Sequence, residues 1–261
     1  MDPVLISLDG GVLCITLNRP EKLNALNPEM HKLLRGALER AADEADARCI
    51  LLTGAGRAFC TGQDLSERKV APGAAPIDLS LSLGSNYNPL VRRMRALPKP
   101  IVCAVNGVAA GAGANIALAC DLVLAARSAA FVQAFCRLGL VPDSGGTYFL
   151  PRLVGAARAM GLALLGDQLS AEDAERWGLI WKAVEDEKLA ETALSLARTL
   201  AGGPTKGYGL IKKALLASPG NSLDAQLDLE RDLQREAGFS ADYREGVAAF
   251  LEKRPPRYTG K

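Results

Sequence analysis

The sequence of 261 residues contains a single histidine, His31. Hydrolases that use an imidazole base, and zinc sites that need several imidazoles, would all depend on that one residue. His31 lies near the start of a predicted helix, with no carboxylate partner on its helical face, and we interpret it as a partly solvated helix residue. Most histidine-dependent chemistry is therefore disfavoured.

The sequence also lacks an excess of one charge and any long apolar run. Its 31 Lys and Arg residues nearly balance its 29 Asp and Glu residues. The resulting formal charge of +2 gives no general attraction to nucleic acid or a membrane surface. No stretch approaches the roughly 18 apolar residues of a spanning helix. The opening MDPVLISLDG lacks the basic and then apolar order of a signal peptide. We expect a cytoplasmic protein without nucleic-acid or membrane partners.

Paired cysteines are absent as well. No CxxC motif indicates a redox centre or a zinc knuckle, so no metal or redox cofactor is predicted. Unpaired cysteines are frequently small core residues, and we expect free thiols in apolar surroundings. The six are Cys14, Cys49, Cys60, Cys103, Cys120 and Cys136.

Nucleotide-binding fingerprints are incomplete. Gly54-Ala-Gly56 and Gly111-Ala-Gly113 each follow a predicted strand, but the third glycine of GxGxxG is replaced by Phe59 and Ile116. No acidic residue stands about 20 positions further on, where a ribose would need one. No GxxxxGK[ST] motif occurs, so neither a Rossmann site nor a P-loop is predicted.

What is present is an α/β pattern. Residues 4–8 and 12–17 are β-branched runs around Asp-Gly-Gly, which predicts a hairpin. Residues 28–46 have apolar side chains at helical spacing, with Asn27 as the predicted N-cap. The continuous apolar runs 49–53 and 101–106 are typical of buried parallel strands, so the chain is predicted to contain βαβ units.

Further along, the pattern changes from strands to helices. Residues 66–86 lack periodicity and predict a loop beside a site. A helix over 112–119 and a strand over 121–125 follow, and almost everything after Ser170 is predicted to be helical. The predicted helices span 171–177, 187–200, 205–217, 222–237 and 241–252.

Two glycine-bearing turns and one carboxylate are the candidate chemistry. The turns 57–64 and 106–115 contain small residues that let a ligand approach the backbone, and N–H groups at a helix start can stabilise an oxyanion. Asp143 lies in Val-Pro-Asp-Ser-Gly-Gly. From residue preference alone, Asp143 is equally a turn or N-cap residue, and spacing does not decide between these roles.

Four blocks together resemble the crotonase (enoyl-CoA hydratase/isomerase) superfamily, in that family's order and separation: residues 17–26, 58–65, 99–113 and 139–147. The resemblance covers essentially the whole chain. It implies an α/β crotonase-like fold, in which repeated ββα units form a spiral core over 1–200 and residues 201–261 form a helical trimerisation region. It further implies a homotrimer or hexamer.

The resemblance also assigns the site. In the family a coenzyme A thioester carbonyl accepts hydrogen bonds from two backbone N–H groups, which here belong to Cys60 and Ala112; the family usually has glycine at the second position. Coenzyme A enters as part of the substrate. The residues expected to line its channel are Ala58, Thr61, Gly62, Gln63 and Asp64.

The departures from the hydratases favour an isomerase. Their two catalytic glutamates correspond to Asn115 and Phe135, neither of which is a carboxylate, whereas Asp143 matches the single acid/base carboxylate of the isomerases. Stretches 129–143 and 226–246 most resemble members that convert ring-1,2-epoxyphenylacetyl-CoA to oxepin-CoA in aerobic phenylacetate catabolism. We therefore expect an acyl-CoA isomerase in which Asp143 moves a proton.

Three alternatives remain open. The same residues would serve a Δ3,Δ2-enoyl-CoA isomerase of fatty-acid oxidation, and the loop 66–87 would discriminate the two substrates. Asp143 could act as a nucleophile, as in the superfamily's aryl-CoA dehalogenases. The missing glutamates also permit a non-catalytic acyl-CoA-binding scaffold that forms a complex with an enoyl-CoA hydratase.

Overall fold

A six-stranded sheet forms the centre of the computed structural model, which describes residues 2–68 and 76–261. The strand order is β1-β2-β3-β5-β7-β10; β1 and β2 are antiparallel, and the other neighbours are parallel. Its strands are β1 Val4–Asp9, β2 Val12–Leu17, β3 Cys49–Gly54, β5 Ile101–Val105, β7 Leu122–Ala126 and β10 Lys182–Val184. Two predictions are confirmed: the hairpin, whose Gly10 and Gly11 have φ angles of 54° and 81°, and the adjacent parallel strands β3 and β5.

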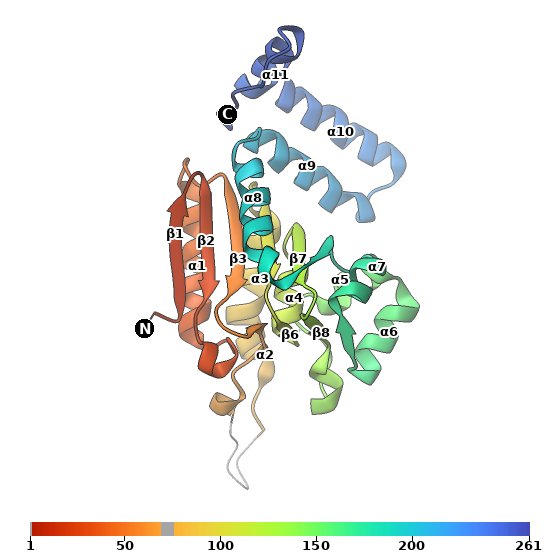
Figure 1. Cartoon of the computed structure of the whole chain (residues 1–261). Coiled ribbons are helices and arrows are strands. Elements are labelled where there is room, and N and C mark those ends of the chain that lie inside the picture. The colour runs from red at the N-terminus through yellow and green to blue at the C-terminus, as the bar shows by residue number, and fades with distance from the viewer. Residues whose placement is uncertain (1, 69–75) are drawn as a thin grey trace.

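Helices cover both faces of this sheet (Figure 1). Helix α1 (Pro28–Asp43) contacts α3 (Asn88–Ala96), and α8 (Leu189–Ala201) packs against β3 and β5. The predicted N-cap is confirmed, because Asn27 Oδ1 accepts a hydrogen bond of 2.9 Å from the Met30 N–H. Helix α1 ends three residues earlier than predicted.

The early end of α1 has a tertiary cause. The Lys99 ammonium donates to the carbonyl oxygens of Ala41 at 2.6 Å and Glu44 at 2.8 Å. These carbonyls lie at the helix end, where intrahelical donors run out, so a cation from a distant segment satisfies them. A partner 55 residues away in sequence is invisible to local pattern analysis.

The prediction for His31 was wrong. Its side chain is 1% exposed, and the part of the chain that the structure describes offers no hydrogen-bond partner to either ring nitrogen. Burial, followed by the positive charge of Arg35, lowers the pKa of His31 to about 4. The imidazole is thus a neutral core side chain.

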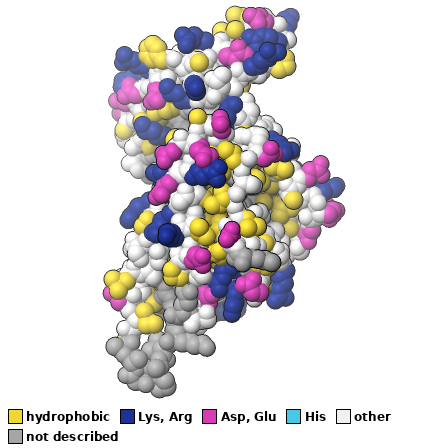
Figure 2. Space-filling view, turned by 90° about the vertical axis from the view of Figure 1, so that its left-hand side faces the viewer, with side chains coloured by type: hydrophobic (Ala, Val, Ile, Leu, Met, Phe, Trp, Pro, Cys, Tyr) yellow, Lys and Arg dark blue, Asp and Glu magenta, His cyan; other side chains and the backbone are white. Residues whose placement is uncertain are grey.

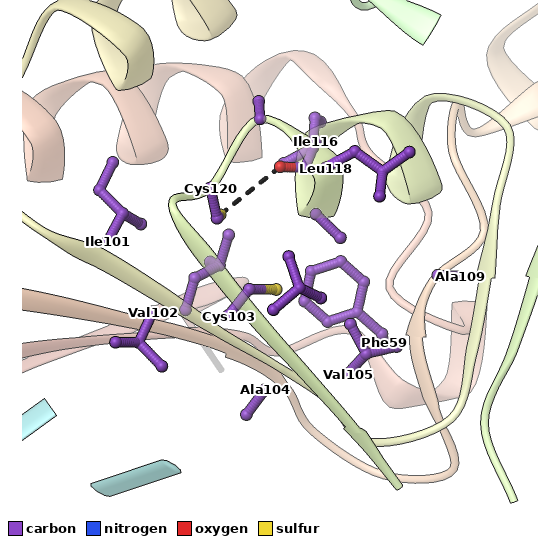
Figure 3. Close-up of a cluster of buried hydrophobic side chains, with 14 of the residues drawn as sticks. Phe59, Ile101, Val102, Cys103, Ala104, Val105, Ala109, Ile116, Leu118 and Cys120 are labelled. Carbon is purple, nitrogen blue, oxygen red and sulfur yellow. Dashed lines mark hydrogen bonds between the residues drawn. The ribbon is translucent and has the colours of Figure 1, made fainter. Parts of the chain in front are cut away.

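The buried core continues between the sheet and α4 (Ala112–Leu118) (Figure 3). There Cys103 points toward the ring of Phe59, and Cys120 Sγ is 3.6 Å from the Ile116 carbonyl oxygen. Four of the six cysteines are buried, and all six are free thiols as predicted. Cys14 and Cys136 are partly exposed.

A second, smaller sheet was not predicted. Its order is β4-β6-β8-β9, and its members are β4 Ala58–Cys60, β6 Val108–Ala110, β8 Ala130–Val132 and β9 Gln168–Ser170. Each strand has three residues, too few to show an alternation of period two. Strands β4 and β6 are parallel neighbours, and both end where a glycine turn begins. This sheet therefore places the two candidate turns side by side.

The segment predicted as a loop over 66–86 is partly helical, which corrects the prediction; residues 69–75 of it lie outside the described residues. Helix α2 (Leu79–Ser82) continues into a π-helical turn over Leu83–Tyr87 and then into α3. Leu79, Leu83 and Tyr87 recur every four residues, which is the apolar spacing of a helix.

The remaining helices form the C-terminal half: α5 Gly146–Val154, α6 Ala156–Leu165, α7 Ala171–Arg176, α9 Thr205–Ala217, α10 Leu223–Gly238 and α11 Ala241–Leu251. The predicted helices after Ser170 are confirmed within a few residues. Strand β10 interrupts them, a correction that its three-residue length explains. Within the described ranges no helix is long and apolar enough to cross a membrane.

Helices α9 to α11 extend beyond the end of the sheet instead of lying on a face (Figure 1). Large apolar side chains on them are exposed, including Phe250 at 83% and Leu223 at 73%. Figure 2 shows hydrophobic and charged side chains side by side on this end of the molecule. The division into a core of 1–200 and a helical region of 201–261 stays a prediction.

Candidate functional site

A cavity of about 520 Å³ lies at the end of the small sheet. Its wall is built by three groups of residues that are distant in sequence: the turn after β4, the start of α4, and the segment 134–143, which contains a 3-10 helix over Ala134–Leu138. The helical segment around Leu79 and Leu83 closes a further side. The lining is mostly apolar, as a site for an acyl group requires.

Asp143 supplies the only carboxylate among the described residues that line this cavity. Phe135, Leu140 and Val141 line it too. Ser144 Oγ donates a hydrogen bond of 2.9 Å to Asp143 Oδ1. A carboxylate in a mostly apolar cavity can accept and return a proton.

Ala112 begins α4 and also lines the cavity. As the first helical residue, Ala112 has an N–H group that the helix itself cannot satisfy. Gly111, with φ 53° and ψ −128°, adopts a backbone conformation that L side chains rarely reach. Gly111 and Ala112 both line the cavity, so the backbone of this turn borders it.

The turn after β4 lies directly against the start of α4. A Cβ atom at Gly113 would lie 2.3 Å from the Cys60 carbonyl oxygen, and one at Gly62 would lie 3.3 Å from the Ala112 nitrogen. Only glycine permits this approach. Cys60 and Ala112, 52 positions apart in the chain, thus lie on adjoining backbone segments.

The Cys60 side chain points away from the cavity. Its Sγ lies 3.2 Å from the Asn24 carbonyl oxygen, and Cys60 is not among the residues that line the cavity. Burial raises the pKa of the Cys60 thiol to about 12. A thiol that stays protonated is no nucleophile, so any role of Cys60 is through its backbone.

The residues predicted for the coenzyme A channel divide into two sets. Thr61, Gly62 and Gln63 line the cavity, whereas Ala58 is buried within β4 and Asp64 lies outside the lining. Asp64 instead accepts hydrogen bonds from Ser66 Oγ at 2.6 Å and Arg19 Nη2 at 2.9 Å. The Ser66 hydroxyl and the Arg19 guanidinium lower the pKa of Asp64, so this carboxylate is an anchor for the turn.

The sequence predicts the segment 66–87 beside the site but singles out none of its residues. Tyr87 is buried and donates from its hydroxyl to Gln63 Oε1 at 2.7 Å, which joins the segment after α2 to the turn after β4. Leu79 and Leu83 line the cavity on the same side. Their spacing of four residues was the available signal, and the surrounding Ser, Gly and Pro residues obscured it.

Phe135 and Asn115 are the positions that the family resemblance assigns to the hydratase glutamates. Phe135 lines the cavity, whereas Asn115 is fully buried beneath the segment that carries Asp143. No group of three His, Cys, Asp or Glu side chains suited to a metal ion occurs in residues 2–68 and 76–261.

Comparisons with known proteins find relatives over nearly the whole length of the chain. The Enoyl-CoA hydratase/isomerase family model matches residues 7–261. A 1,2-epoxyphenylacetyl-CoA isomerase of Escherichia coli is 60% identical over 261 residues, which is all of both chains. A Rhodobacter capsulatus protein named "Probable enoyl-CoA hydratase" is 54% identical over 96% of this chain and 95% of its own.

Solved structures have the same fold. The crystal structure of an enoyl-CoA hydratase from Polaromonas superposes with a TM-score of 0.92 at 34% identity, and the match covers 98% of this chain and 99% of that one. The match includes the two sheets and the C-terminal helices, which confirms the predicted α/β crotonase fold. Matched over nearly its whole length, the chain belongs to the enoyl-CoA hydratase/isomerase (crotonase) family.

Proposed function

We propose that this protein is an intramolecular isomerase of coenzyme A thioesters, and that it converts ring-1,2-epoxyphenylacetyl-CoA to oxepin-CoA in aerobic phenylacetate catabolism. The observation that carries the reaction class is the cavity with one carboxylate, Asp143, in its described lining. The full-length 60% identity to a 1,2-epoxyphenylacetyl-CoA isomerase supports the substrate. Substrate and product have the same atoms, so no other reactant is consumed.

The mechanism uses the backbone and one acid/base. The thioester carbonyl accepts hydrogen bonds from the N–H groups of Cys60 and Ala112, which stabilises negative charge on its oxygen and acidifies the α-carbon. The Asp143 carboxylate takes a proton from that carbon and returns it as the bonds of the acyl group rearrange. Phe135 and Leu140 exclude water from the intermediate.

Substrate binding follows from the cavity walls. Thr61, Gly62 and Gln63 contact the thioester end of coenzyme A. Ala58 and Asp64 do not line the cavity and instead stabilise the conformation of this turn. The mostly apolar lining accommodates the acyl ring. No cofactor beyond the coenzyme A of the substrate enters this mechanism.

A hydratase is the first competing function, because relatives with that name match closely. Acid/base addition of water through the usual pair needs two carboxylates, and Asn115 and Phe135 occupy both positions. A Δ3,Δ2-enoyl-CoA isomerase is the second competitor, and it would use the same groups as our proposal. A non-catalytic scaffold is disfavoured, since a purely binding protein needs no acid in its acyl cavity.

The test is a direct comparison of substrates. The wild-type protein should turn over ring-1,2-epoxyphenylacetyl-CoA faster than a linear 3-enoyl-CoA, and Asp143→Asn should lose both activities while keeping its circular dichroism spectrum. The expected loss is about 10²–10⁴-fold. Preferred turnover of the linear substrate would identify the second competitor, and near-wild-type turnover by Asp143→Asn would remove this residue from the mechanism.

Assembly is part of the proposal. Exposed apolar side chains on α9 to α11 need cover, and a homotrimer, or a hexamer of two trimers, would provide it. These side chains include Leu215, Leu223, Leu227, Phe239 and Phe250. Light scattering should give three or six chains, and a monomer at micromolar concentration would contradict this. A complex with an enoyl-CoA hydratase would be detected by co-elution.

The compartment is inferred from the thiols. Six free cysteines, with Cys103 and Cys120 in one buried cluster, suit a reducing compartment, because an oxidising one would favour disulfides. We therefore place the protein in the cytoplasm, where coenzyme A thioesters are also formed and consumed.

A further inference from the structure

Two buried amide side chains, Asn115 and Gln133, lie directly behind the candidate acid/base. Asn115 is 0% exposed in α4, and its Nδ2 donates a hydrogen bond of 2.8 Å to the main-chain carbonyl oxygen of Asp143. Its Oδ1 accepts one of 2.9 Å from Gln133 Nε2. Gln133 is 3% exposed and immediately precedes the 3-10 helix that contributes Phe135 to the cavity.

The direction of these bonds is set by chemistry. A carbonyl oxygen accepts only, so the NH₂ group of Asn115 must face Asp143. Its oxygen then faces Gln133, and Gln133 must in turn present its own NH₂ group. The pair is thus a one-way chain of donors that ends on the backbone of the acid/base residue.

The Asp143 backbone needs such an anchor. The next two residues, Ser144 and Gly145, have φ angles of 51° and 86°, and for a serine that region is unfavourable. The Asp143 carbonyl accepts a second hydrogen bond from the Gly146 N–H at 2.8 Å. A Cβ at Gly146 would lie 2.4 Å from Asn115 Nδ2, so amide and loop are in close contact.

One buried polar atom of Gln133 lowers the stability of the folded protein. Among the described residues its Oε1 is buried with no hydrogen-bond partner. An apolar side chain of similar length, such as methionine, would remove this unsatisfied acceptor, but it would leave the buried Asn115 Oδ1 without the hydrogen bond that it accepts from Gln133. What methionine would not supply is the Nε2 donor that orients the Asn115 amide.

We infer that Asn115 and Gln133 are positioning residues that hold the Asp143 carboxylate in register with the thioester site. The inference rests on the proposed isomerase function. Neither residue lines the cavity, so the role proposed for them is exerted through Asp143. Asn115 belongs to the helix that begins with Ala112, so its side chain joins the acid/base to the element that presents the second N–H group.

The first variant separates positioning from folding. Gln133→Met exchanges the unsatisfied acceptor of Gln133 for that of Asn115, so its melting temperature should stay within a few degrees of the wild-type value. Its kcat should nevertheless fall by about three- to ten-fold with KM within two-fold, since a misplaced catalytic group lowers the chemical step. A structural role would lower stability and activity together, which would overturn the inference.

The second variant gives a pH signature. Asn115→Asp has the same shape, but a carboxylate cannot donate to the Asp143 carbonyl, whereas a protonated carboxyl group can. The ratio of its kcat to that of the wild type should rise at least three-fold from pH 8 to pH 5.5. A ratio independent of pH would contradict the positioning role. Asn115→Ala should lower kcat about 10²-fold and slow α-proton exchange with deuterated water in parallel.

The matched control is another Asn–Gln pair. Asn221 Nδ2 donates to Gln226 Oε1 at 2.9 Å on the exposed junction before α10, far from the cavity. Asn221→Ala should keep wild-type kcat and exchange rates. Wild-type rates in Gln133→Met and both Asn115 variants would overturn the inference. A wild-type protein that isomerises neither substrate refutes the proposed function first, and the inference with it.

Discussion

The rings of His31 and Tyr87 pack edge to face, with centroids 4.3 Å apart and planes inclined by 75°. Tyr87 lines the cavity and donates to Gln63, so the one histidine supports the wall of the site without contacting the substrate. Burial and the positive charge of Arg35 lower its pKa to about 4, so the imidazole is neutral at neutral pH.

The first prediction concerns the pH dependence of stability. The pKa of His31 is about 4 in the folded protein, below the ordinary value near 6.5 of an unfolded chain. The unfolded state therefore binds the proton more tightly, and stability falls as pH drops from about 6.5 to about 4. The full effect is up to about 3 kcal/mol. His31→Leu should flatten this part of the curve in urea titrations and keep turnover at pH 8. An unchanged curve would show that His31 is charged or solvated.

The second prediction tests the contact between the two turns. Gly113→Ala would place a methyl group 2.3 Å from the Cys60 carbonyl oxygen, so the turns must separate and the two N–H groups lose their common target. Loss of one oxyanion donor costs about 10²–10³-fold in kcat. We expect a loss of that size in steady-state assays, with coenzyme A thioester binding largely retained.

The control for that variant is Gly36→Ala. Gly36 lies on the exposed face of α1, and nothing lies within 4 Å of the position of an added Cβ. Alanine is the better helix former, so stability should rise by up to about 1 kcal/mol with unchanged kcat. Equal losses of activity in both variants would mean that Gly113 has no special place in the site.

The third prediction separates the Cys60 backbone from its thiol. Cys60→Ala keeps the N–H group, and with the thiol pKa raised to about 12 the wild type has almost no thiolate to lose. Turnover should stay within about three-fold of the wild type, and iodoacetamide at pH 8 should not inactivate either protein. Inactivation of the wild type alone, blocked by substrate, would make the thiol a catalytic group.

The sequence predicted long elements well and short ones poorly. Strand β3 can be predicted from its continuous apolar run and helix α9 from its helical periodicity. The three-residue strand β4 is too short for such a signal, and it forms through its pairing with β6. Asp143 was located through its motif. Its anchor, Asn115, and the wall residue Tyr87 act through contacts between segments distant in sequence, which no local pattern records.

The last prediction concerns the end of the chain, which is tied to α11 by one buried acid. Asp242 is 3% exposed, and its carboxylate accepts hydrogen bonds from the N–H groups of Thr259 at 2.7 Å and Gly260 at 2.8 Å. Hydrogen bonds to a charged group contribute about 1.5–3 kcal/mol each. Asp242→Ala should therefore destabilise the protein by several kcal/mol in urea titrations and release the tail to carboxypeptidase.

Asp228→Ala, which changes an exposed acid on α10, should alter stability by less than about 1 kcal/mol. Because the tail lies far from Asp143 along the fold, kcat per folded molecule should be unchanged, and a large loss of kcat would show that the C-terminal helices take part in the site.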